Sequence, residues 1–241
     1  MRMRVFLCIL IGWWGMMIHA QLLPPIYNYT PSEYKGESQN WKICQADNKK
    51  IYFANNIGLL EFNGVVWQRY PLPNGAIARA VSAKGNTLYT GGFAEFGYWQ
   101  PNKFNELQYT SLSRQLNPAD IEDEEIWKII FSDRWVLFQS LHKIFIYDTQ
   151  QQSFKIISAA HPKIFKIGEH IYFQKMKEGL FKLVNGEEVL VTDHPLFREH
   201  ILINLLPQKE HFLFVTQDKG IYEGTPTQIE AWKVSASQLI N

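Results

Sequence analysis

Three residues of this 241-residue chain could together bind a ligand, because they stand at matching places in its repeating units. Trp41, Arg79 and Trp127 each lie at, or just ahead of, the start of a predicted inner strand. Indole faces beside polar groups suit a sugar ring, since they give it an apolar platform with hydrogen bonds at its edge. The alternative is that the tryptophans pack between neighbouring units. Glu95, flanked by aromatic residues in a predicted turn, is a further candidate: either a tethering carboxylate or a solvent-facing residue.

Motifs for catalysis or for tight metal binding do not occur in the sequence. We find no His-Glu-x-x-His, Gly-x-Ser-x-Gly, Cys-x-x-Cys or phosphate-binding loop, and we predict no catalytic residue, no metal and no cofactor. A glycosidase or lyase would need two carboxylates at a defined separation, and no carboxylate recurs at a distinctive position. The acidic run at residues 122–125 lacks a calcium-loop pattern and is interpreted as a solvated loop.

The elements that would position these residues form a repeat. An apolar-aromatic triplet recurs, and in four copies a glycine follows it before another apolar strand begins; the triplets start at Ile51, Leu88, Val136, Ile171 and Phe212. An apolar segment precedes each triplet, and several units end with a fourth. Each unit is therefore about 40 residues with four short strands, which is typical of a β-propeller blade. The predicted fold class is all-β.

The predicted propeller has five visible blades, approximately 41–74, 77–112, 125–160, 164–197 and 202–234. Residues 21–40 form an N-terminal segment, in which Ile26–Tyr29 could add a closing strand. Residues 111–125 are predicted to be an inserted loop with a helical turn. Propellers contain four to eight blades, and residues 235–241 resemble the start of a connection. We therefore expect an incomplete ring and a chain that is the N-terminal portion of something longer.

The first 20 residues predict export. Arg2 and Arg4 precede a 14-residue apolar run, and Ile18-His19-Ala20 offers a cleavage site, as in a secretory signal peptide. An uncleaved anchor is the alternative. Cleavage would leave Cys44 as the one cysteine, and its alternating apolar surroundings indicate a buried small hydrophobe rather than a reactive thiol.

Composition excludes one class of partner. The chain is 46% hydrophobic and 15% aromatic, with a formal net charge of +1. It is therefore globular, and it lacks the basic field that nucleic-acid binding requires.

Several motifs resemble those of a family of exported bacterial sensors, the two-component-regulator propeller proteins with a triple-tyrosine domain. The resemblance covers nearly all of residues 24–234, and its specific motifs are at residues 26–31, 34–36, 39–41, 51–56, 58–64 and 91–99. It implies a periplasmic propeller followed by a β-sandwich module, a membrane helix and a helix-turn-helix or histidine kinase output. None of these later parts is visible here, so any membrane or DNA contact would belong to downstream residues.

We therefore predict an extracytoplasmic ligand-sensing propeller without catalytic activity, whose ligand is a glycan or another small molecule. Two alternatives stay open. An incomplete ring exposes strand edges, so the chain could instead be a secreted scaffold that binds proteins or forms a homodimer. The second alternative, which we favour less, is an enzyme: a propeller glycosidase or lyase.

Overall fold

The computed structural model describes residues 25–209 and 211–233, so the predicted signal at residues 1–20 and the terminal segment 235–241 lie outside the described residues. The chain divides into two compact units, residues 1–30 and 31–241. In the first unit, residues 25–30 form no strand, so the closing strand expected at Ile26–Tyr29 is absent. Among the described residues, no helix is long and apolar enough to span a membrane.

The second unit contains five four-stranded antiparallel sheets, which confirms the all-β prediction. In each sheet the strands follow one another in chain order, as expected for blades. The first blade contains β1 (Asn40–Gln45), β2 (Ile51–Asn55), β3 (Gly58–Phe62) and β4 (Trp67–Tyr70). The second contains β5 (Ala78–Lys84), β6 (Thr87–Gly92), β7 (Phe96–Pro101) and β8 (Leu107–Ser111).

The other three blades repeat this pattern. The third contains β9 (Lys128–Ser132), β10 (Trp135–Gln139), β11 (Lys143–Asp148) and β12 (Ser153–Ser158). The fourth contains β13 (Lys163–Ile167), β14 (His170–Lys175), β15 (Gly179–Val184) and β16 (Glu187–Thr192). The fifth contains β17 (Leu202–Gln208), β18 (His211–Thr216), β19 (Ile221–Thr225) and β20 (Gln228–Ala231).

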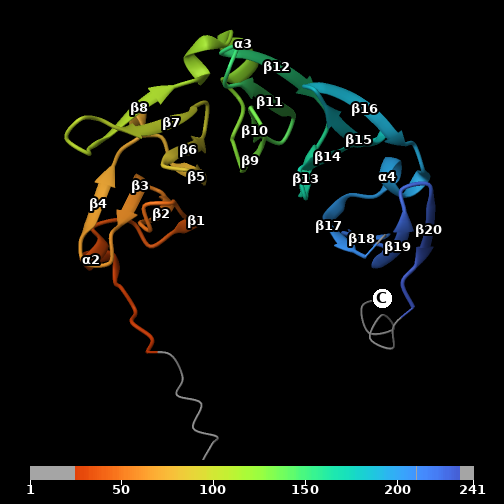
Figure 1. The fold of residues 1–241 in the computed structure, drawn as a ribbon, viewed down its shortest axis with the longest axis horizontal. Coiled ribbons are helices and arrows are strands. Elements are labelled where there is room, and N and C mark those ends of the chain that lie inside the picture. Colours follow the sequence, from red (N-terminus) through yellow and green to blue (C-terminus); the bar gives the residue numbers. More distant parts are fainter. Residues whose placement is uncertain (1–24, 210, 234–241) are drawn as a thin grey trace, which may run out of the picture. The chain divides into compact units, whose positions relative to one another are not determined.

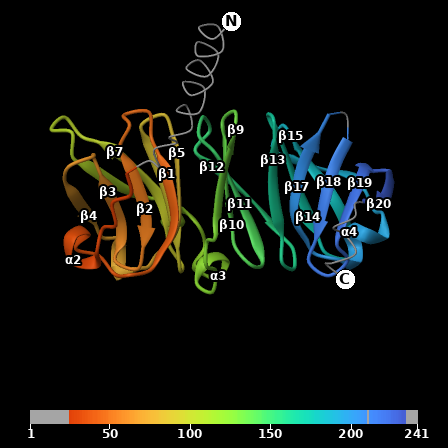
Figure 2. The ribbon, with the colours of Figure 1, turned by 90° about the horizontal axis from the view of Figure 1, so that it is seen from below.

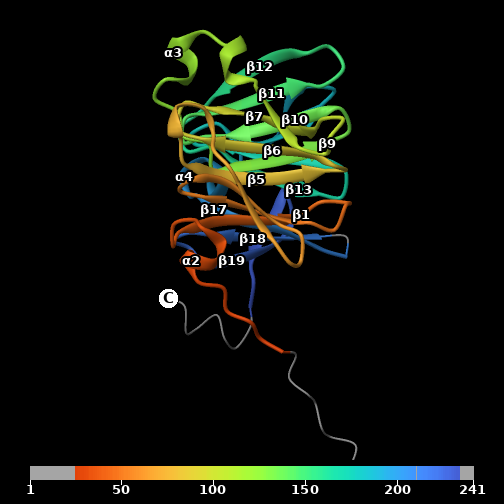
Figure 3. The ribbon, with the colours of Figure 1, turned by 90° about the vertical axis from the view of Figure 1, so that its left-hand side faces the viewer.

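Short helical segments precede four of the five blades. They are α2 (Pro31–Tyr34), η2 (Pro73–Gly75), η3 (Ser113–Gln115), α3 (Pro118–Ile121) and α4 (Pro195–Glu199). The helical turn predicted at residues 111–125 is thus confirmed. Because α2, α3 and α4 lead into β1, β9 and β17, they lie on the side where these first strands begin, as Figures 2 and 3 show.

Apolar side chains hold neighbouring blades together face to face. Four clusters of buried residues lie at the four successive blade interfaces. For example, Ala54 and Leu59 of the first blade pack with Leu88 and Trp99 of the second. Within residues 31–233, Figure 1 shows the blades following one another with β1, β5, β9, β13 and β17 on the inner side. These five strands therefore line one common region.

Two repeat glycines are required for different reasons. Gly58, which begins β3, has φ +116°, a backbone conformation that glycine adopts without strain. Gly97, the repeat glycine of the second blade, does not have a positive φ. A Cβ atom at Gly97 would instead lie 2.1 Å from the Thr110 carbonyl oxygen of the neighbouring strand. Close approach of two strands explains this glycine.

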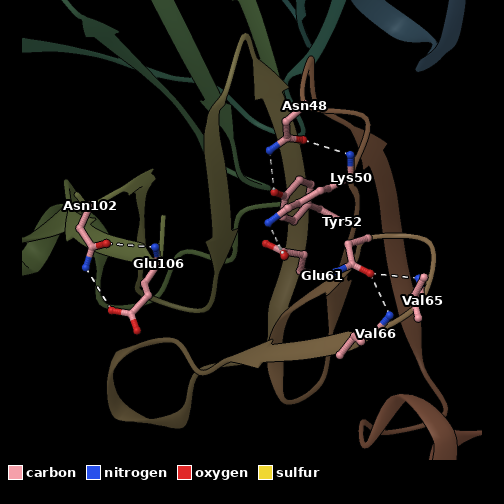
Figure 4. A network of polar contacts seen from close by, with 9 residues as sticks. Asn48, Lys50, Tyr52, Glu61, Val65, Val66, Asn102 and Glu106 are labelled. Carbon is pink, nitrogen blue, oxygen red and sulfur yellow. Dashed lines mark hydrogen bonds and ion pairs between the residues drawn. The ribbon is translucent and has the colours of Figure 1, made fainter. Parts of the chain in front are cut away.

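Polar contacts stabilise the β1–β2 hairpin of the first blade near its turn, as Figure 4 shows. Lys50 Nζ lies 2.7 Å from Glu61 Oε1, and Asn48 Nδ2 donates to the Tyr52 hydroxyl at 3.3 Å. Glu61 is only 3% exposed, so Lys50 supplies the countercharge that its burial requires. This network belongs to the β1–β2 turn, opposite the end where β1 begins.

Candidate functional site

Bulges in the first strands position two of the predicted site residues. In β1 the pairing with β2 shifts between Asn40 and Lys42, which leaves Trp41 without a partner in the ladder. In β5 it shifts in the same way between Ala78 and Ala80, which leaves Arg79 unpaired. A β-bulge redirects the side chain of the extra residue. The matching positions predicted for Trp41 and Arg79 are thus confirmed by the register.

Trp127 lies at the same level in the third blade. It directly precedes β9, and its backbone N–H donates to the Gln139 carbonyl at 2.9 Å, although Gln139 already pairs with Lys128. Two successive residues therefore face one residue of the neighbouring strand, as at a bulge. Three consecutive blades each present one side chain at the start of the inner strand.

The three side chains meet. The Arg79 guanidinium carbon lies 3.8 Å from the centroid of the Trp41 ring and 5.2 Å from that of Trp127. The two indole rings are 5.9 Å apart, edge to face at 80°. This geometry is favourable because the edge of one ring and the guanidinium both approach the electron-rich face of an indole. We call Trp41, Arg79, Trp127 and Glu125, described next, the tryptophan–arginine cluster.

Glu125 fixes the arginine, and the sequence did not reveal this role. Arg79 Nε donates to Glu125 Oε1 at 2.6 Å, and the two side chains are 17% and 24% exposed. Glu125 also forms an isolated β-bridge with Phe93, which ties the inserted loop to the second blade. The prediction of a solvated loop at residues 122–125 is confirmed for Glu122 and Asp123, which are exposed, and is wrong for Glu124, which is 5% exposed, and for Glu125, which is paired.

Trp41 is oriented by a second contact chain. Its indole Nε1 donates to Asn56 Oδ1 at 2.8 Å, and Asn56 Nδ2 donates to Glu37 Oε2 at 3.0 Å. The backbone segment that holds Glu37 is itself anchored, because its N–H and carbonyl both bond the side chain of Asn55. Trp41 is thus held in one orientation although it is exposed.

The cluster leaves apolar ring surface available to a ligand. Trp41 is 38% exposed and Trp127 is 36% exposed, values well above those of a tryptophan buried between blades such as Trp99, at 4%. Around the rings lie a guanidinium, a carboxylate and an amide that can form hydrogen bonds. Packing between blades, the alternative for these tryptophans, occupies part of each ring, since the two rings contact each other and Arg79, and the remaining ring surface is exposed.

Glu95 lies apart from the tryptophan–arginine cluster. It is 6% exposed, and its Oε1 accepts hydrogen bonds from the hydroxyls of Tyr109, Ser111 and Ser113 at 2.8, 2.7 and 3.0 Å. Burial raises the pKa of Tyr109, and the adjacent carboxylate raises it further. Glu95 therefore fastens the β6–β7 turn to β8. A hollow of about 320 Å³ adjoins it, lined also by Arg114.

Cys44 has the character predicted for it. The thiol is free and partly buried, and it packs against the interface of the first two blades. Burial raises its pKa to about 11, while the charge of Lys42 opposes this effect. Thiolate is the reactive form, so Cys44 is unreactive at neutral pH.

No protein-family model matches this sequence, and no curated protein is similar to it. The fold, however, resembles several solved structures. The extracellular domain of BT4673 from B. thetaiotaomicron, a proposed one-component or hybrid two-component system, superimposes with a TM-score of 0.55 at 14% identity. The match covers 79% of this chain and 27% of that domain, so the chain spans about a quarter of its length.

Two further structures show the same architecture. PorZ, a bacterial surface component of the type-IX secretion system of Porphyromonas gingivalis, gives a TM-score of 0.52 at 10% identity, over 83% of this chain and 27% of PorZ. The WD40 β-propeller domain of Doa1 gives 0.54 at 12% identity, over 80% and 67%. At these identities the comparisons establish the fold: the five sheets of this chain are propeller blades.

Proposed function

We propose that this chain is the ligand-recognising propeller of an extracytoplasmic sensor in a signal-transduction or transcription regulator, and that it binds a carbohydrate through the tryptophan–arginine cluster. One observation carries the proposal: partly exposed tryptophans from the first and third blades meet over an arginine from the second. A site assembled from three blades can respond to a ligand by changing how those blades pack. Recognition without chemical conversion of the ligand is part of the proposal.

Two further observations support the sensor role and the location. The N-terminal 20 residues have the pattern of an export signal. The structures that this fold resembles include an extracellular domain of a proposed signalling system and a bacterial surface component. Both favour a propeller that faces the periplasm and meets ligands from outside the cell.

A titration of the full chain with oligosaccharides tests the proposal. Isothermal calorimetry with a panel of neutral and acidic oligosaccharides should show saturable binding to one sugar class. Trp41→Ala and Trp127→Ala should each weaken that binding about tenfold, since an aromatic stacking contact is worth about 0.5–1.5 kcal/mol beyond the area it buries. Mass spectrometry should find the saccharide unchanged.

Phe104 provides the matched control for loss of an exposed aromatic ring. It is 71% exposed on the β7–β8 hairpin and lies outside the cluster. Phe104→Ala should bind like the natural chain, and circular dichroism should show all three variants folded. Binding that persists unchanged in both tryptophan variants would overturn the assignment of the site. The absence of saturable binding to any saccharide would overturn carbohydrate sensing and favour the protein-binding scaffold.

A further inference from the structure

Lysine residues occupy one equivalent position in three of the inner strands. The residues that follow the bulge positions are Lys42 in β1, directly after Trp41, and Lys128 in β9, directly after Trp127. Lys163 begins β13, and it pairs with Gln174 as Lys128 pairs with Gln139. The register therefore places three lysines at one level, beside the tryptophan–arginine cluster.

The contacts of Lys128 place its ammonium group between the third and fourth blades. Lys128 Nζ donates to the Ile164 carbonyl at 2.7 Å, and it lies 5.5 Å from the Phe165 ring, so it reaches from the third blade to the fourth. Burial lowers its pKa, and the charges of Lys42 and Lys163 lower it further. Lys128 is thus close enough to Lys42 and to Lys163 for their charges to act on its ammonium group.

Carboxylates do not neutralise the three lysines. Among the described residues, the ion pairs within 4 Å include none formed by Lys42, Lys128 or Lys163. Glu125 already forms an ion pair with Arg79. Glu37, the other carboxylate of the site, bonds Asn56. The four cationic side chains of the site therefore outnumber its two carboxylates.

We propose that the ligand is an acidic carbohydrate, whose carboxylate or sulfate group is bound by Lys42, Lys128 and Lys163 while a sugar ring stacks on the tryptophans. This inference rests on the function proposed above and adds the chemical class of the ligand. An anion bound at these lysines would offset the repulsion that Lys128 receives from Lys42 and Lys163, and it would form charge-assisted hydrogen bonds, which are stronger than neutral ones. A neutral sugar would gain neither effect.

The test compares acidic oligosaccharides with neutral partners of the same sugar. Oligogalacturonates and their methyl esters differ in the carboxylate, and a sulfated disaccharide and its desulfated form differ in the sulfate. We expect one acidic member to bind the full chain at least tenfold more tightly than its neutral partner, since a hydrogen bond to a charged group contributes about 1.5–3 kcal/mol. Raising the salt concentration should weaken that member alone. Which pair shows the difference identifies the anionic group.

Substitution of the lysines locates the effect. Lys42→Gln and Lys163→Gln should each weaken binding of the acidic member roughly tenfold and leave the neutral partner within about twofold. Lys166→Gln is the matched control, because Lys166 is exposed on the same strand β13 and its Nζ pairs instead with Glu169 at 3.6 Å. Lys42 is exposed, so its variant keeps the test valid if the Lys163 variant does not fold.

The outcomes separate this inference from the proposed function. Equal binding of acidic and neutral partners, or acid binding that neither lysine variant weakens, would overturn the anionic class and leave carbohydrate sensing in place. No saturable binding to any of the four saccharides would overturn both. Acid binding that depends on the lysines but not on the tryptophans would support the anion site and overturn stacking on the cluster.

Discussion

Replacement of Arg79 by methionine should destabilise the blades that meet at the tryptophan–arginine cluster. Met keeps much of the volume of the arginine stem but removes the guanidinium. The variant loses the 2.6 Å contact with Glu125, worth about 1.5–3 kcal/mol as a hydrogen bond between charged groups. It also loses the cation–π contact with Trp41, worth about 0.5–1 kcal/mol because that ring is partly exposed. The free energy of unfolding should therefore fall by about 2–4 kcal/mol.

A double-mutant cycle with Glu125→Gln isolates the ion pair. Both side chains are less than a third exposed, so water only partly screens their interaction. Glu125→Gln alone should cost about 1–2 kcal/mol, because its amide oxygen still accepts a hydrogen bond but the countercharge is lost. The double variant should be more stable, by about 1–2 kcal/mol, than the sum of the two single losses predicts. Each single variant loses the ion pair, whereas the double variant loses it only once.

Equilibrium urea denaturation of the four proteins measures the cycle, followed by both tryptophan fluorescence and circular dichroism. Agreement of the two probes is required because repeat architectures can unfold in steps. Arg79→Lys serves as the control for charge without planarity, and it should lie between the natural chain and Arg79→Met. If the single losses add to within about 0.5 kcal/mol, Arg79 and Glu125 are not coupled and the reasoning is refuted.

Three further predictions concern packing and titration. Gly91→Ala should lower the free energy of unfolding by about 1–3 kcal/mol, because its Cβ would lie 2.5 Å from Ile126 Cγ2; the double variant with Ile126→Ala, which removes Cγ2, should lose less on denaturation than the sum of the two single losses, and no loss in the Gly91→Ala variant would contradict the clash. Cys44 should react slowly with a thiol reagent at pH 8, since burial raises its pKa to about 11; labelling as fast as that of an unfolded control would contradict this. Compared with strongly alkaline pH, Lys128→Met should gain free energy of unfolding over the natural chain at pH 7, because burial lowers the pKa of this lysine; loss of the 2.7 Å hydrogen bond to the Ile164 carbonyl opposes that gain. That advantage should vanish as the pH rises through the folded pKa to the ordinary value of 10.5, and a pH-independent difference would refute the assignment.

The repeat made much of the fold predictable from the sequence. Residues that recur at one place in successive blades must lie at one level of the propeller, which is why Trp41, Arg79 and Trp127 were predicted together and are found in contact. Glu125 was not predicted, because it belongs to an inserted loop that has no counterpart in the other blades. The buried role of Glu95 depends on three hydroxyl groups in and after β8, and no spacing rule identifies such partners in advance.

The lysines were missed for a different reason: a single lysine beside a strand start is unremarkable, and only the register reveals that three share a level. In the second blade the equivalent position is occupied by Ala80, which is 2% exposed. A small apolar residue can therefore fill this position in a folded blade. Placing the Lys128 ammonium group there instead costs stability, because burial and the charges of Lys42 and Lys163 both oppose its charged form. A conflict between local stability and residue choice is expected at functional sites. The three lysines at this level are therefore better explained by the proposed anion binding than by a contribution to the folding of the blades.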